Sequence, residues 1–450
     1  MTYRHRSRFA PAWTHTGFAG LGPSGGVGEA YTSFQARLNA FSHTVMGDGG
    51  CSNATDDDGR LLWATADGRC LWAGGDPSTD VYAAFAYDAV YALANAMHRT
   101  LVAASGASLD GVALMDQLLN TSFVGASGLV GFDEHGDRDS GVSYEVYNVA
   151  TQGMPILGMW QQGVTWSSRF NSSAPYMAAD GSSEVTELSG LLLELGVLCT
   201  EATAGSDEER EECDHVLHTG KPSSLISPLC TPSLCPSLDP LPITLPTVDR
   251  INDKGDGWYD ELLPNHTIVT TTQSVGCVQE RARIGWRALK ASLPRFTAVI
   301  GPACSNDVAD LTNAEWRASD GSRAVVVSPQ STAPTLADKS AYPNLARTSG
   351  TDVHMARAFA KLCEAFGWDR VALLHDDSVW GSGGAAAVKT SVAAVNVEVM
   401  ATVDFELAAF DDGSVHVREL IDRLAAASPR VIVLVTQVRV QRAICAQCPA

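Results

Sequence analysis

Two hydroxyl side chains, Ser305 and Thr332, each follow an apolar run with the composition of a buried strand, and together they could hold a carboxylate. Ser305 comes after the run 297–300 and a Gly-Pro pair, at about the N-cap of the next predicted helix, where we expect its hydroxyl to be free. Thr332 lies in the hydroxyl-rich loop after the predicted strand 324–327. Unpaired backbone N–H groups and the helix dipole favour a carboxylate or phosphate at a helix start. Capping and turn chemistry accounts for the same residues, so the pattern alone leaves both interpretations open.

Apolar β-branched runs alternate with turns and helical stretches through the second half of the chain, and these elements must position the two hydroxyls. Such alternation predicts βαβ units and a parallel sheet, whose carboxyl-terminal strand ends bind ligands in open α/β folds. We expect strands at 267–272, 297–300, 324–327, 370–374, 397–403 and 430–434, and helices at 278–292, 307–319, 352–366, 383–395 and 415–426.

The first 165 residues show a different order of elements. Apolar residues at helical spacing predict helices at 76–100 and 109–119. Residues 127–149 alternate around a polar turn at 134–140, which predicts a hairpin, and a strand follows at 155–160.

Residues 166–262 form a join between these two parts. The apolar run 188–199 is short and interrupted by Glu194, so it predicts a buried helix and not a membrane span. An acidic run at 201–214 is typical of a solvated or disordered surface. The proline-rich stretch 222–246 predicts an irregular linker, and the four cysteines of the join lack paired C-x-x-C spacing, which favours disulfides over zinc: Cys199, Cys213, Cys230 and Cys235.

Three stretches carry a resemblance to a known family: GPACS, SPQSTAPTLADKSAYPNLAR and FGWDRVALLHDD. With their spacing, they resemble the ligand-binding region of Venus-flytrap receptors, the periplasmic-binding-protein type I domains of metabotropic glutamate, type-B GABA and natriuretic-peptide receptors. The resemblance implies an α/β fold of two doubly wound, parallel-sheet lobes joined by a hinge. It also implies a crossing between lobes near 347–351.

The same resemblance assigns roles to four residues. Ser305 and Thr332 match the positions that hold the ligand carboxylate from the first lobe, and Asp352 in RTSGTD matches the aspartate that holds the ligand amine. Trp380 in DDSVWGSGG falls where an aromatic residue covers the ligand from the second lobe. Tyrosine is usual at that position in the family. Because Trp380 departs from this pattern, the resemblance does not identify the ligand. The family also implies a disulfide between Cys277 and Cys304.

Residues 81–160 resemble the last third of the same kind of domain, so the family order is reversed along this chain. We expect residues 1–165 to be the C-terminal part of one flytrap domain, 166–262 a linker, and 263–450 the N-terminal part of a second. This order favours a piece of a tandem array cut inside a domain at both ends, and a faulty gene model would give the same order. In the alternative, a circular permutation, residues 1–165 complete the sheet that residues 265–450 begin.

Composition fits an extracellular chain. A net charge of −20 and a pI near 4.8 argue against binding to nucleic acid or to anionic membranes. Eleven cysteines and four N-x-[ST] sequons, at Asn53, Asn120, Asn171 and Asn265, are typical of secreted glycoproteins, and the odd cysteine count leaves one thiol unpaired within the chain. Cys51 and Cys70 flank a loop that carries a sequon, and a disulfide between them is one possible pairing; Cys363 lies within a predicted helix and has no obvious partner.

The N-terminus lacks the apolar core of a signal peptide, and no apolar run is long enough to span a membrane. We therefore expect the chain to be a piece of a longer protein that is anchored in a membrane with this part on the extracellular side. The family implies a possible homodimer through the first lobe.

Four features could indicate an enzyme, a metal site or a nucleotide site, and none forms a catalytic constellation. Cys304 lacks a histidine at an indicative position; the other three are His375-Asp376-Asp377, Cys445-x-x-Cys448 and Gly381-Ser382-Gly383-Gly384. We expect no enzyme activity, metal or cofactor. The expected function is an extracellular receptor region that binds a small amino-acid-like ligand and signals by lobe closure. A soluble solute-binding protein and a tandem interaction module without a working pocket are the alternatives.

Overall fold

The structure is a computed structural model. It describes residues 18–26, 28–46, 81–103, 110–149, 156–162, 191–195, 241–257, 259–271, 279–292, 296–311, 323–411, 413–427, 429, 431–436 and 440.

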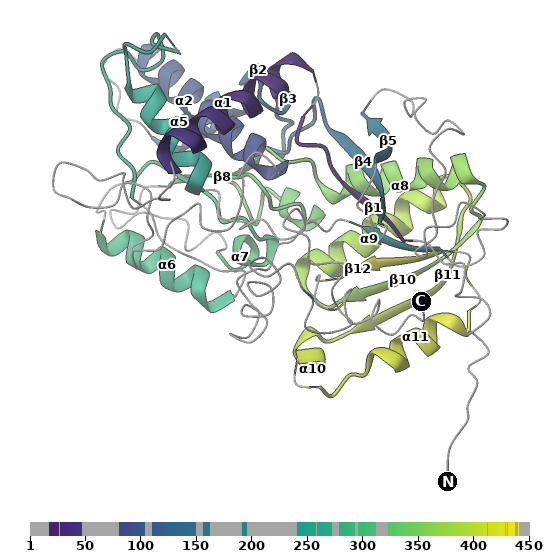
Figure 1. Cartoon of the computed structure of the whole chain (residues 1–450). Helices are drawn as coiled ribbons and strands as arrows, with labels where there is room; N and C mark the ends of the chain where they lie inside the picture. Colours follow the sequence, from purple (N-terminus) through teal and green to yellow (C-terminus); the bar gives the residue numbers. More distant parts are fainter. Residues whose placement is uncertain are drawn as a thin grey trace.

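Two lobes of mixed helix and sheet lie side by side (Figure 1). The first lobe has a parallel three-stranded sheet in the order β7-β8-β9 and a small antiparallel hairpin of β2 and β3. Its elements are α1 (Glu29–Met46), α2 (Val81–Ala103), α3 (Gly111–Leu119), β2 (Ser122–Gly125), β3 (Gly128–Gly131), α5 (Leu241–Asn252), α6 (Gln279–Ser292), β7 (Ala298–Ile300), α7 (Ser305–Asp310), β8 (Val325–Ser328), the 3-10 turn η5 (Pro334–Ala337) and β9 (Leu345–Arg347).

The second lobe is built on a seven-stranded sheet in the order β11-β10-β12-β6-β1-β4-β5. The strands from β11 to β1 are parallel, whereas β4 and β5 are antiparallel to their neighbours. Its elements are β1 (Phe18–Pro23), β4 (Ser143–Val149), β5 (Ile156–Gln161), β6 (Leu191–Leu195), α8 (Asp352–Phe366), β10 (Arg370–Asp376), α9 (Val379–Ala393), β11 (Glu398–Phe405), α10 (Leu407–Asp411), α11 (Val417–Ala425) and β12 (Val431–Val435).

Successive residues of the second-lobe strands face two different cores. Leu373 and Val433 pack with α8 and α9, while their neighbours Leu374 and Ile432 pack with α11. Because side chains alternate across a strand and both faces are covered by helices, the central strands are apolar on both faces over residues 371–374 and 431–435. The expected doubly wound arrangement is confirmed for this lobe.

Strands from both ends of the chain share this sheet. β1, β4 and β5 come from residues 1–165, and β10, β11 and β12 come from residues 263–450. β6, from the join, pairs with β12 on one side and β1 on the other. The sheet of the second lobe is therefore assembled from segments more than 200 residues apart in the sequence.

Most of the expected elements in the second half of the chain are confirmed, and the helix 352–366 has the bounds predicted. The hairpin at 127–149 is wrong. β3 pairs with β2, and β4 pairs with β1 and β5, because residues 132–142 between them cross from one lobe to the other. The buried helix expected at 188–199 is also wrong, since Leu191–Leu195 is a strand inside the sheet. A short apolar run has the same composition in a buried strand and in a buried helix.

Two further expectations differ from the structure. Residues 267–271 of the expected strand 267–272 are irregular, and the expected irregular linker 222–246 runs into α5, which contains Pro246. α5 forms because its apolar face packs on α2, where Val248 and Ile251 meet Val90 and Tyr91. Among the described residues, no helix is long and apolar enough to cross a membrane.

In the described part of the chain, three connections join the lobes: residues 24–28, 132–142 and 348–351. They are hydrogen-bonded to one another and to both lobes. The Ser24 amide donates to the Ser143 carbonyl at 2.9 Å, and the Tyr144 hydroxyl donates to the Thr351 carbonyl at 3.1 Å. The Thr348 hydroxyl donates to the Phe85 carbonyl of α2 at 2.8 Å.

A buried ion pair lies at these connections. Arg347 is fully buried, and its Nε and Nη2 donate to Oδ1 and Oδ2 of Asp137 at 2.7 and 2.8 Å. Its Nη1 donates to the Ala333 carbonyl at 2.7 Å and to the Ser331 carbonyl at 3.3 Å. The two charges satisfy each other in the two-point geometry that a guanidinium and a carboxylate favour, and Arg347 also fixes the loop after β8.

Arg138 follows Asp137 in the sequence and is also buried, and its guanidinium donates to backbone carbonyls and to one hydroxyl. It reaches the carbonyls of Ser127, Leu129, Ser140 and Thr348 and the Ser127 hydroxyl. Nearby, the carboxylate of Asp88 accepts from the amides of Ala126 at 2.6 Å and Ser127 at 3.0 Å. Burial raises the pKa of Asp88, and the charge of Arg138 opposes that rise.

We expect Asp137→Asn to lower the free energy of unfolding by about 3–5 kcal/mol, because it leaves the Arg347 guanidinium buried and unpaired. Arg347→Met is expected to cost a similar amount. The double variant is expected to cost clearly less than the sum of the two, since it leaves no lone charge. Chemical denaturation measures all three.

Asp422→Asn serves as the control, because it breaks the exposed Arg418–Asp422 pair at 3.3 Å and is expected to change stability by less than about 1 kcal/mol. Additive effects of the two substitutions at the buried pair would show that residues 137 and 347 do not meet, and that the two ends of the chain do not share one folded unit.

Candidate ligand-binding site

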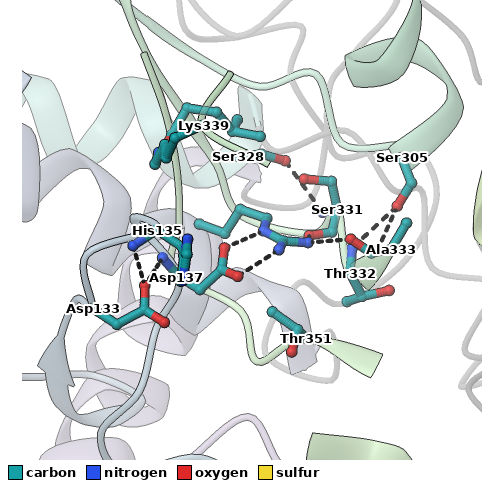
Figure 2. Close-up of polar contacts among 12 residues, drawn as sticks. Asp133, His135, Asp137, Ser305, Ser328, Ser331, Thr332, Ala333, Lys339 and Thr351 are labelled. Atoms are coloured by element: carbon teal, nitrogen blue, oxygen red, sulfur yellow. Dashed lines mark hydrogen bonds and ion pairs between the residues drawn. The ribbon is translucent and has the colours of Figure 1, made fainter. Parts of the chain in front are cut away.

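Ser305 fastens two loops of the first lobe to each other. It is the first residue of α7 and Cys304 is the N-cap, which corrects the expected N-cap position of Ser305. Its hydroxyl oxygen accepts from the backbone amides of Thr332 and Ala333, both at 3.1 Å, so the expected free hydroxyl is also wrong (Figure 2). Both acceptor positions of the oxygen are engaged, and among the described residues no hydrogen bond uses the hydroxyl proton.

Asp352 begins α8, directly after the crossing at 348–351, and it is 3% exposed. Its amide donates to the Thr332 carbonyl at 2.9 Å. Burial raises the pKa of its carboxyl to about 7, against the pKa-lowering effects of the Thr332 hydrogen bond, the charge of Arg347 and the Trp380 hydrogen bond. Within the described part of the structure, its Oδ2 has no hydrogen-bond partner.

Trp380 belongs to the second lobe and reaches the first. It is the second residue of α9, whose N-cap Ser378 accepts from the Gly381 amide at 3.0 Å. Its side chain packs against the second-lobe core and also against the first-lobe core under β8. The structure therefore brings Thr332, Asp352 and Trp380 together at the junction of the lobes, with Ser305 bonded to the Thr332 loop.

Sequence reasoning missed the residue that supports this site from below. Arg347 donates to the carbonyls of Ser331 and Ala333 on either side of Thr332, and Asp137 holds Arg347 in place. Figure 2 shows Asp137, Ser331, Thr332 and Ala333 gathered around these contacts. Arg347 stood in the NLAR stretch that carried the family resemblance, but nothing local marks Asp137 as its partner.

Three other features of the sequence fall on described residues: Asp376, Cys304 and Cys363. Asp376 ends β10, where its Oδ1 accepts from the Ser378 amide at 3.1 Å and its Oδ2 accepts from the Thr436 hydroxyl at 3.0 Å. Cys304 is disulfide-bonded, and its predicted partner Cys277 lies outside the described residues, so that pairing stays a prediction. Cys363 is a free, buried thiol, and burial raises its pKa to about 12.

Two of the four sequons fall on described residues, Asn120 and Asn265, and both are exposed. Glycosylation stays a prediction at all four. Asn53 and Asn171 lie outside the described residues, as do Cys51, Cys70, Cys199, Cys213, Cys230, Cys235, Cys445 and Cys448.

Asp352→Asn is expected to change how stability depends on pH. In the wild type the folded state keeps the Asp352 proton up to a pKa of about 7, whereas the unfolded state loses it near the ordinary value of 3.8. Between these values the folded state binds more protons, so stability falls as pH rises from about 4 to about 7, by a few kcal/mol. The asparagine of the variant cannot ionise, so the variant should gain stability relative to the wild type across that range.

Denaturation of both proteins at pH 5 and pH 8 measures this difference. Asp307→Asn provides a matched positive control. Asp307 is a buried first-lobe carboxyl, and burial together with the charge of Asp310 also raises its pKa to about 7, so its replacement should have the same kind of effect on the pH profile. Parallel pH profiles for the wild type and Asp352→Asn would contradict the environment described for this carboxyl.

Comparison with known protein families finds one match, the receptor family ligand binding region, at residues 60–152 and 247–447. No curated protein matches the chain. The two matched segments cover well over half of the 450 residues and contain all four predicted ligand residues, the crossing at 348–351 and the Asp137–Arg347 pair. The chain therefore belongs to the receptor family ligand binding region, a Venus-flytrap domain of the periplasmic-binding-protein type I class.

Proposed function

We propose that this chain is the extracellular ligand-binding region of a membrane receptor and that it holds a small amino-acid-like ligand between its two lobes. Family membership supports a ligand-binding role. The observation that carries the proposal is the Asp352 carboxyl, which is buried at the lobe junction with an Oδ2 that has no partner in the described structure. A buried polar atom left unsatisfied is costly, and a ligand ammonium group would satisfy it.

The surrounding groups match the two charges of an amino acid. An ammonium at Oδ2 would stabilise the ionised carboxylate and lower the pKa of Asp352 from about 7. The Trp380 ring would add a cation–π contact from the second lobe. On the first-lobe side, the Ser305 hydroxyl proton and the Thr332 loop would donate to the ligand carboxylate.

Binding between the lobes would couple to their closure. A ligand shifts a conformational equilibrium only by its difference in affinity for the two states, and contacts from Trp380 of the second lobe exist only when the lobes are together. The signal would pass to membrane-bound parts of the full receptor. A homodimer through the first lobe would transmit it between subunits.

We also propose that the matched segments form one flytrap domain in permuted order. Their shared second-lobe sheet and the contact between Asp137 and Arg347 support this over two pieces of separate domains in an array. Helix α2, from the first family segment, then packs on α5, from the second, in the same lobe. Residues 166–240 would connect the two family segments.

The two alternative functions, a soluble solute-binding protein and a tandem interaction module, predict different observations. A soluble solute-binding protein would also bind a small ligand between the lobes, and the full gene would then lack a membrane anchor. A tandem interaction module would fold and self-associate without binding any small ligand.

The first experiment is thermal unfolding of the purified chain with each of a panel of amino acids. A ligand that binds only the folded state raises Tm by mass action, by an amount equivalent to about 2.7 kcal/mol at a hundred times its Kd. We expect at least one amino acid to raise the Tm of the wild type at pH 8, and we expect that shift to vanish in Asp352→Asn. Thr332→Val, which keeps the side-chain shape, should reduce it.

Asp307→Asn again provides the control, because it removes a buried carboxyl of the first lobe that is not predicted to touch the ligand, so it should keep the Tm shift. Ser305→Ala is unsuitable, since it strips the partner from two backbone amides and destabilises the loop itself. A well-folded protein whose Tm responds to no amino acid would sink the amino-acid proposal and favour the interaction module.

A further inference from the structure

Two side chains from the second lobe are part of the first-lobe core. Val379 and Trp380, the first two residues of α9, pack against the cluster that contains Val326, Ala333 and Leu336 of the first lobe. Trp380 also packs against the second-lobe core, so this one side chain is shared by both lobes. Apolar surface buried in this way stabilises the lobes in contact, at about 25 cal/mol for each Å² removed from water.

The backbone of α9 also lies directly on the first lobe, against η5 and α7. Gly383 makes this approach possible. A Cβ atom at that position would lie 3.2 Å from Cδ of Pro334, across the junction, and a longer side chain would have no room. A Cβ at Gly384 would lie 3.7 Å from Oδ2 of Asp352. The helix presents its glycine backbone where the lobes meet.

Groups predicted to hold a ligand are already bonded to other groups of the protein. The Ser305 hydroxyl accepts from two backbone amides of the Thr332 loop. The Asp352 carboxyl interacts with the side chains of Thr332 and Trp380, and the indole N–H is the only polar group that Trp380 can offer. Trp380 thus contributes a donor at the carboxyl where a ligand amine would bind.

We propose that the two lobes hold themselves closed without ligand, with Trp380 bridging both cores and the Gly383 backbone of α9 seated on η5. Trp380 acts as a tethered substitute for part of the ligand. A ligand ammonium then binds Oδ2 of Asp352 beside the indole and adds contacts to a closed state that is already populated. The closed population does not depend on the identity of any ligand, so this inference stands or falls separately from the amino-acid proposal.

The regulatory consequence concerns the receptor in its resting state. When most molecules are already closed before binding, a ligand that favours the closed state can add little to the closed population. Closure would give a basal signal, and a ligand that displaces Trp380 without restoring its contacts would lower that signal.

Electron–electron distance measurements on the ligand-free chain test the proposal. Spin labels carried by unnatural amino acids at the exposed positions Val124 of the first lobe and Met400 of the second leave the native cysteines untouched. We expect a single short-distance population in the wild type. Trp380→Ala and Gly383→Leu should each shift it to longer distances, because one removes the bridge and the other fills the space beside Pro334.

Ala386→Leu is the matched control, since it adds bulk to an exposed position of the same helix and should leave the short distance unchanged. If Trp380→Ala does not fold, Trp380→Leu takes its place with the same expected shift. A wild type that is open without ligand would overturn the proposal. So would a Trp380 variant that keeps the wild-type distance, even if Gly383→Leu opens.

Discussion

Arg347 and Asp137 meet where β9 leaves the first lobe and the connection at 132–142 passes it, with contacts of 2.7 and 2.8 Å. Removing the two charges from water costs several kcal/mol each. The pair is tolerated because the buried guanidinium donates to both carboxylate oxygens of Asp137 and to two backbone carbonyls. The remaining nitrogen of Arg347 holds the carbonyls of Ser331 and Ala333. The position of the Thr332 loop, and through it the candidate site, therefore depends on a residue from the other end of the chain.

The second buried arginine extends the same constraint. Arg138 donates to the Thr348 carbonyl at 3.1 Å, and Thr348 in turn donates to α2 of the first lobe. Two adjacent residues of one connection thus contact the start of the crossing: Asp137 pairs with Arg347 at the end of β9, and Arg138 donates to Thr348. In the proposed closure, such connections would favour rotation of the lobes over sliding, because sliding would separate buried charges from their partners.

Local patterns predicted the elements whose partners lie close in sequence. Helix 352–366 matched to the residue because its apolar spacing, and the left-handed Gly367 that ends it, are local signals. The strands are apolar on both faces at 324–327 and 371–374. The failures share one cause. β4 looked like one arm of a hairpin, and Leu191–Leu195 looked helical, because their true neighbours β1 and β12 are far away in the chain. The same holds within the site: Ser305 was found from its motif, but the two amides that occupy its oxygen belong to another loop.

The junction of the lobes combines groups that oppose each other energetically. An unpartnered carboxyl oxygen on Asp352 weakens the closed form, and an apolar bridge through Trp380 strengthens it. The fold does not require either side chain, since an asparagine would fit in place of Asp352 at the start of α8 and a smaller side chain would fit in place of Trp380 in α9. A protein selected for stability alone would remove the unsatisfied atom, and strain of this kind is typically retained at functional sites. In the proposed closed state, the Trp380 bridge favours contact between the lobes, and Oδ2 of Asp352, which has no partner among the described residues, leaves a position that a ligand ammonium would satisfy.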